Sequence, residues 1–99
     1  MIIIAGQFRF PAENLAQARA AMETVIAGSR AENGCLRYAF AEDVLEPGLF
    51  HVSEAWTDRP ALDAHMTQPH LADWRAAAGT LGLHDRAVTI YEAEAVQTL

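Results

Sequence analysis

The sequence is poor in basic residues and in cysteine, and it has no long hydrophobic run. Seven Lys and Arg stand against thirteen Asp and Glu, which gives a formal net charge of -6. Binding to nucleic acid or to an anionic membrane needs clustered positive charge that neutralises phosphates, and the seven basic residues are scattered. We therefore expect neither of these partners.

The single cysteine, Cys35, has no second cysteine in the chain with which to form a disulfide. The first ten residues, MIIIAGQFRF, have neither the basic start nor the long apolar stretch of a signal peptide. No apolar run approaches the roughly 20 residues that cross a bilayer. These features predict a cytoplasmic protein without a transmembrane segment.

The chain does contain enough apolar material for one domain. Hydrophobic side chains make up 52% of the 99 residues. That proportion is sufficient for one modest core, and a chain of this length is too short to bury two. We therefore predict a single domain over residues 1–99.

Four stretches alternate between two sides with the period of two that is typical of β-strands. They are residues 2–10, 35–42, 49–56 and 84–95. The first stretch is apolar on both sides at its start, which is typical of a strand covered on both faces. In the second stretch, Leu36, Tyr38 and Phe40 are predicted to share one side of the sheet, with Cys35 and Arg37 on the other.

Between the strands, apolar residues recur at the three- and four-residue spacing of amphipathic helices. Pro11 is predicted to open the first helix, and Asn33-Gly34 to end it with a left-handed cap. Asp58 is predicted to cap a second helix over residues 59–66. After an interruption, a further helix is predicted to run to the glycine-containing stop at residues 79–82.

The predicted order is therefore strand, helix, strand, strand, helix pair, strand. This order is typical of the ferredoxin-like split βαβ fold, an α+β class with a four-stranded antiparallel sheet and helices on one face. The other sheet face would still carry large apolar residues, and such a face is more often an interface than a solvated surface. We therefore expect a homodimer joined face to face.

Polar and aromatic side chains are densest from Glu54 to Trp74, in EAWTDRPALDAHMTQPHLADW. His65 and His70 are the candidate catalytic residues, because an imidazole with a pKa of about 6.5 accepts a proton near neutral pH. The alternative is structural, with His65 bonded to a nearby carboxylate and His70 on the surface at a helix start. Two histidines without a placed third ligand are a weak signal for a metal, and we predict none.

Other residues are candidates for contact with a small-molecule substrate. Glu54 would be partly buried and would need a partner, either a histidine that it orients or an arginine or backbone group at the dimer interface. Trp56 would form part of either the pocket wall or the hydrophobic core. A buried Gln7 would bind substrate or bridge strands. The predicted substrate-binding residues are Trp56, Glu54, Tyr38, Phe40, Trp74 and Gln7.

Four short motifs carry a resemblance to a known family. They are NGCLRY from Asn33 to Tyr38, EAW from Glu54 to Trp56, ALDAH from Ala61 to His65 and PHL from Pro69 to Leu71. Together they resemble the antibiotic biosynthesis monooxygenase family of small dimeric α+β barrel proteins, over nearly the whole chain. The resemblance implies a pocket between sheet and helices, and a cofactor-free oxygenase that oxidises a hydroquinone, an anthrone or another small aromatic substrate with dioxygen.

The family that the chain resembles also contains haem-degrading enzymes, and three positions of this sequence indicate whether it could act in the same way. By spacing, the positions that hold an Asn, a Trp and a haem-ligating His in those enzymes hold Gln7, His65 and Arg75 here. Because no ligand stands at the third position, haem degradation is not expected, although His70 or His84 could take its place. No cofactor is predicted.

Two alternatives to the oxygenase stay open. An isomerase could move a proton between carbons of a small carbonyl compound in the same pocket. The chain could also be a non-catalytic ligand-binding domain whose histidines are structural. Fold and family do not decide between these functions, because one fold supports many. We expect an enzyme.

Overall fold

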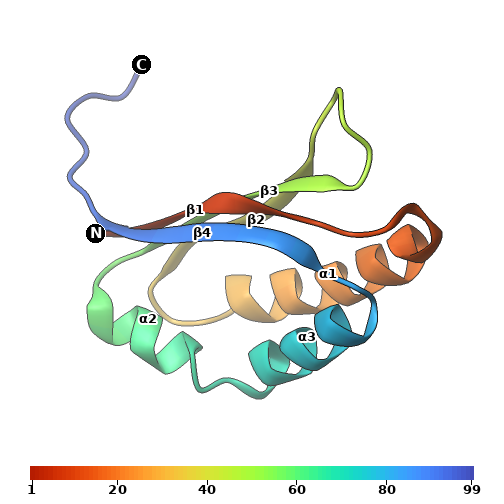
Figure 1. Ribbon diagram of the computed structural model, residues 1–99. Coiled ribbons are helices and arrows are strands. Elements are labelled where there is room, and N and C mark those ends of the chain that lie inside the picture. The colour runs from red at the N-terminus through yellow and green to blue at the C-terminus, as the bar shows by residue number, and fades with distance from the viewer.

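The computed structural model describes all of residues 1–99 and consists of one sheet with helices on one side (Figure 1). The elements in chain order are β1 (Ile2–Arg9), the short 3-10 helix η1 (Ala12–Asn14), α1 (Leu15–Arg30), β2 (Cys35–Glu42), β3 (Leu49–Trp56), α2 (Arg59–His65), α3 (Pro69–Thr80) and β4 (His84–Glu92). The four strands lie in the order β2-β3-β1-β4, and every neighbouring pair is antiparallel. The predicted ferredoxin-like α+β fold is confirmed.

Local signals place the helices close to their predicted bounds. Asp58 caps α2, because its side chain accepts a hydrogen bond from the backbone N–H of Ala61 at 2.9 Å. A proline stands in the first turn of both α2 and α3, where its missing N–H costs no helical hydrogen bond. After Pro11 the chain makes the 3-10 turn first, so α1 begins only at Leu15.

A β-bulge at the start of β2 corrects one predicted pattern. Cys35 pairs with Trp56 and Arg37 pairs with Ala55, so Leu36 is the extra residue between them. An extra residue reverses the alternation that follows it. Cys35 therefore packs against the core, and Leu36 is 58% exposed. The prediction that Leu36 shares a side with Tyr38 and Phe40 was wrong for this reason.

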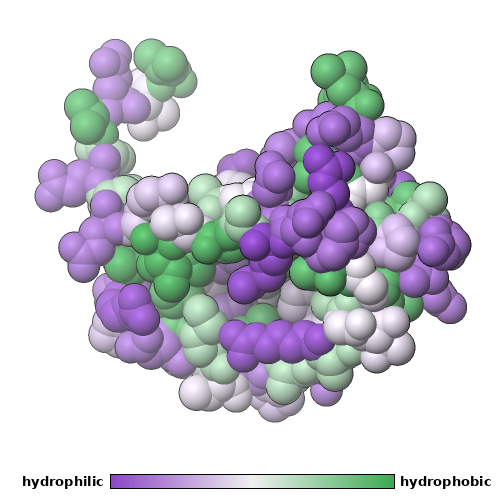
Figure 2. All heavy atoms as spheres, in the orientation of Figure 1, coloured by the Kyte–Doolittle hydropathy of each residue, from purple (hydrophilic) through white to green (hydrophobic).

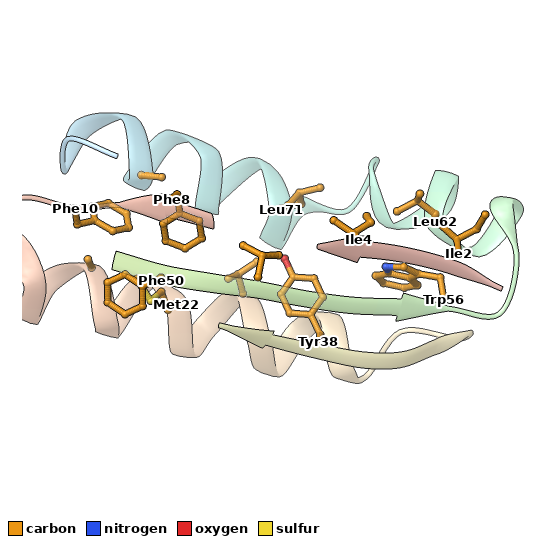
Figure 3. Packing of buried hydrophobic residues seen from close by; sticks show 14 residues of the cluster. Ile2, Ile4, Phe8, Phe10, Met22, Tyr38, Phe50, Trp56, Leu62 and Leu71 are labelled. Carbon is orange, nitrogen blue, oxygen red and sulfur yellow. The ribbon is translucent and has the colours of Figure 1, made fainter. Parts of the chain in front are cut away.

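The hydrophobic core fills the layer between the sheet and the helices (Figure 3). At one end Trp56 lies beside Leu62, and both side chains are fully buried. At the other end the ring of Phe8 lies 5.6 Å from that of Phe10 and 5.7 Å from that of Phe50. Each such side chain contributes about 1.5–3 kcal/mol when it is buried, so this layer holds α2 and α3 firmly against the sheet.

The sheet face away from the helices is uncovered, and two segments project beyond it. Figure 1 shows the β2–β3 connection and the C-terminal residues 93–99 reaching out on that side. β4 ends at Glu92 rather than at the predicted residue 95, and the chain leaves the sheet there. The face carries the large side chains of Ile3 and Tyr91 among smaller and polar ones.

No helix of this fold has the length and the apolar character needed to cross a membrane.

At Gly6 the strands β1 and β4 lie too close together for a side chain. A Cβ at this position would overlap the carbonyl oxygen of Ala87 and lie 2.6 Å from the Cα of Val88, both of which are backbone atoms. We expect Gly6→Ala to lower the free energy of unfolding by about 3 kcal/mol, because the backbone of a paired strand cannot move aside. Urea unfolding measures this loss.

Gly79→Ala is the matched control. A Cβ on Gly79 meets no atom within 4 Å, and alanine is favoured over glycine inside a helix by about 0.5–1 kcal/mol. Equal stability of the two variants would contradict the close approach of β1 to β4.

Candidate functional site

A cavity of about 540 Å³ lies between the helix-facing side of the sheet and the helices α2 and α3. Residues of all four strands contribute to its lining, and 12 of the 17 lining residues are hydrophobic. Figure 2 shows hydrophobic atoms gathered on this side of the molecule, below β4 and above the helices. The volume and the apolar lining are typical of a pocket for one small molecule, because such pockets have volumes of about 300–1,000 Å³.

His65, the last residue of α2, is one of the few polar residues of this lining. Its side chain is 2% exposed, and Nδ1 lies 2.7 Å from Oε2 of Glu32. The ring packs against Trp56 with 4.5 Å between the ring centroids and against Tyr38 with 5.5 Å. Because an ionised carboxylate only accepts hydrogen bonds, the Nδ1 of a neutral His65 carries the proton, and Nε2 is left as an acceptor.

Glu32 binds a second histidine with the same oxygen atom. It lies in the turn between α1 and β2, and its Oε2 is 2.8 Å from Nε2 of His70 at the start of α3. The ring of His70 rests on Gly28 of α1, where a Cβ would lie 2.9 Å from Cγ of the imidazole. The side chains of Glu32 and His70 are 11% and 21% exposed. This cluster of Glu32, His65 and His70 therefore extends from the cavity wall toward the surface.

Glu54 is a second acidic residue at the cavity, and its surroundings differ from those of Glu32. Its carboxylate accepts a hydrogen bond from Nε1 of Trp56 at 3.1 Å. Burial raises the pKa of Glu54 to about 7, against the lowering effects of the Trp56 hydrogen bond and the positive charge of Arg86. The hydrogen-bond partner is thus an indole, whereas the sequence had led us to expect a histidine, an arginine or a backbone group. Residues 54 and 56 share one side of β3, which makes the indole the nearest donor.

The structure brings most of the predicted site residues together. His65, Glu54, Tyr38, Phe40 and Trp74 all line the cavity. Burial raises the pKa of Tyr38 far above its ordinary value, so its hydroxyl keeps its proton and remains a hydrogen-bond donor.

Three predicted site residues lie elsewhere. His70 is outside the cavity lining, and it is connected to His65 through Glu32 and through its ring, whose centroid lies 6.1 Å from that of His65. Trp56 is fully buried beside His65 and does not form part of the cavity wall. Gln7 pairs with His51 and Ala87 on the uncovered face of the sheet, where it cannot contact a molecule in the cavity.

Glu32 is the site residue that sequence reasoning missed. It stands in a polar turn between Arg30 and Asn33, a setting in which a glutamate is ordinarily solvated. It is 33 and 38 residues from its two partners. No local spacing connects positions so far apart, so only the packing of the three helices reveals the cluster.

Fold and cavity together define an α+β protein of ferredoxin-like topology with a largely apolar cavity between its sheet and helices. Within that class, the family model described as antibiotic biosynthesis monooxygenase matches residues 1–77. The chain belongs to the antibiotic biosynthesis monooxygenase family, and the resemblance of its motifs is confirmed.

Individual relatives agree with this membership. The chain is 32% identical to an uncharacterised protein of Synechocystis sp., over 99% of this chain and 67% of that protein. The crystal structure of a candidate antibiotic biosynthesis monooxygenase from Deinococcus radiodurans has a TM-score of 0.92 and 32% identity, and the match covers 100% of this chain and 99% of that one. The structure of Rv0793 from Mycobacterium tuberculosis has a TM-score of 0.83 and 30% identity, with 98% and 97% of the two chains covered.

The raised pKa of Glu54 predicts a pH-dependent stability difference. The folded carboxyl keeps its proton up to about pH 7, whereas an exposed one loses it near 4.5. The folded state therefore loses stability as the pH rises from about 4.5 to 7. Glu54→Gln keeps an acceptor for the indole and removes the ionisation, so we expect it to stabilise the protein at pH 8 by up to about 3 kcal/mol.

Urea unfolding of wild type and variant at pH 4.5 and pH 8 measures this effect. Taking the difference between the two proteins cancels the titration of all other groups. A difference that is the same at both pH values would contradict a buried, protonated Glu54.

Proposed function

We propose that the protein is a cofactor-independent monooxygenase that oxidises a small aromatic substrate, of the hydroquinone or anthrone type, with dioxygen. The observation that carries this proposal is the setting of His65. Its imidazole lines a largely apolar cavity, and Glu32 holds its Nδ1 at 2.7 Å. A base held in one tautomer and one orientation beside an apolar site is what proton abstraction from such a substrate requires.

The reaction begins with proton transfer to Nε2 of His65 from a phenolic hydroxyl or a benzylic carbon. Glu32 stabilises the imidazolium that forms, because its carboxylate already contacts Nδ1. The electron-rich substrate anion then passes an electron to dioxygen. For a benzylic CH₂ group, one oxygen atom becomes the new carbonyl, and the other leaves as water with the two hydrogens. No further reductant is needed.

The cavity supports this chemistry in two ways. Its apolar walls exclude water, which strengthens every charge interaction inside. Tyr38 and Arg86 both line the cavity, and a phenol that keeps its proton or a guanidinium can stabilise a negatively charged substrate oxygen. Phe40 and Trp74 offer flat apolar surfaces to an aromatic ring.

We further propose that two copies of the chain pair through the uncovered sheet face. Tyr91 is 50% exposed there, and the segments that project beside the face carry the exposed side chains of Val44, Leu45, Val96 and Leu99. Burial of these apolar groups against a second copy would stabilise a dimer.

The first prediction from this proposal concerns oxygen consumption. We expect the protein to consume dioxygen with at least one member of a panel of hydroquinones and anthrones. His65→Gln should lower kcat by about 10²- to 10⁴-fold, the usual contribution of a general base. An oxygen electrode measures both effects. His84→Ala is the control, because His84 is exposed and outside the cavity lining, and its ring bonds the carbonyl of Gly82.

Two results would contradict the oxygenase. The first is a panel that leaves dioxygen unconsumed, and the second is a folded His65→Gln variant with unchanged turnover. Solvent deuterium that enters a small carbonyl compound without oxygen uptake would favour the isomerase instead.

The second prediction concerns the oligomeric state. Sedimentation at micromolar concentration should show two subunits. Tyr91→Glu places a charge on the uncovered face and should shift the protein toward the monomer, whereas Ala72→Glu adds the same charge to the exposed side of α3 and should not. A wild-type protein that sediments as a monomer would contradict the pairing.

A further inference from the structure

Three side chains of the cluster point donor atoms at one place. Oε2 of Glu32 lies 2.7 Å from Nδ1 of His65 and 2.8 Å from Nε2 of His70. All three atoms lie within 4.8 Å of one another. They come from the turn after α1, the end of α2 and the start of α3, so the packing of three separate segments holds them together.

We propose that Glu32, His65 and His70 form a binding site for a divalent transition-metal ion such as Zn²⁺ or Co²⁺. Two imidazoles and one carboxylate are a ligand set that suits Zn²⁺, Co²⁺, Ni²⁺ and Fe²⁺, whereas Mg²⁺ and Ca²⁺ prefer oxygen ligands alone. From the sequence we predicted no metal, because no third ligand could be placed beside the two histidines. The structure supplies that ligand in Glu32.

The distances from the Glu32 oxygen to the two imidazole nitrogens are close to what an ion requires, and the two nitrogens lie within 4.8 Å of each other. Ligands about 2.1 Å from a shared ion lie about 3 Å apart at right angles and about 3.4 Å apart in a tetrahedron. The two Glu32 contacts are shorter than these separations by a few tenths of an ångström. A small outward movement of the carboxylate, whose residue lies in a turn, would therefore open the space for an ion.

The surroundings hold two of the ligands in place and leave a route to the third. Trp56 packs on the ring of His65, and Gly28 lets α1 come close to the ring of His70. His70 is the most exposed of the three side chains, so an ion can enter from its side. Three protein ligands leave at least one coordination position for water.

Metal binding would change the tautomer of His65. An ion at Nδ1 needs the lone pair of that nitrogen, so the proton of the neutral ring sits on Nε2 instead. His65 could then donate a hydrogen bond to a molecule in the cavity but could not accept a proton from it. The ion would therefore inhibit proton abstraction. This consequence rests on the proposed function, whereas metal binding itself does not.

Titration calorimetry with Zn²⁺, in the absence of any substrate, tests the site directly. We expect one ion per chain. Glu32→Gln and His70→Ala should each weaken binding at least tenfold, since the loss of even an outer-shell partner of a metal site costs about 10- to 100-fold. With Co²⁺, nuclear magnetic resonance should show strongly shifted ring protons of two histidines, and only one in His70→Ala.

His51→Ala is the matched control, because His51 also contacts a carboxylate, Asp43, at 2.8 Å, but in a pair without a third ligand. Its affinity for Zn²⁺ should equal that of the wild type. Circular dichroism shows whether each variant is folded. If Glu32→Gln does not fold, the affinity of His70→Ala for Zn²⁺ decides the test. The proposal is overturned if wild type binds no ion, if both cluster variants bind as tightly as wild type, or if only His51→Ala loses binding.

Discussion

The site depends on the contacts of the Glu32 carboxylate with the imidazoles of His65 and His70. A nearly buried carboxylate is costly unless it is paired, and here one oxygen atom contacts two imidazoles. Hydrogen bonds to a charged group contribute about 1.5–3 kcal/mol each, which offsets the loss of water. The same contacts tie the turn after α1 to the end of α2 and the start of α3. The carboxylate of Glu32 therefore contributes both to the stability of the fold and to the geometry of the site.

The two acidic residues of this region have different surroundings and therefore different chemistry. Glu32 has two imidazole partners, at 2.7 and 2.8 Å from one of its oxygen atoms. Glu54 has a single indole donor in an apolar wall, and burial raises its pKa to about 7. Near neutral pH one carboxylate can thus orient a base while the other holds or releases a proton at the cavity. A carboxyl group whose pKa is raised toward neutrality, as that of Glu54 is, is typical of sites that perform acid–base chemistry.

Much of the fold could be predicted because its signals are local. The bounds of β2 and β3 follow the alternation of residues 35–42 and 49–56, and the Asp58 cap marks the start of α2. The exception at Leu36 arises from a bulge, which depends on how β2 pairs with β3 and leaves no mark in the spacing. Gln7 is a similar case, because alternation separates two faces of a strand but does not say which one the helices cover.

The sequence by itself determined the order of the elements and the family, and it named His65 as a candidate base, since these depend on short motifs and on periods of two and 3.6 residues. Only the tertiary structure decided that Glu32 joins His65 to His70, that Trp56 supports the site from behind, and that Glu54 is paired with an indole. The physical reason is distance along the chain. Glu32 is separated from its partners by 33 and 38 residues, and the packing of helices on the sheet alone brings them into contact.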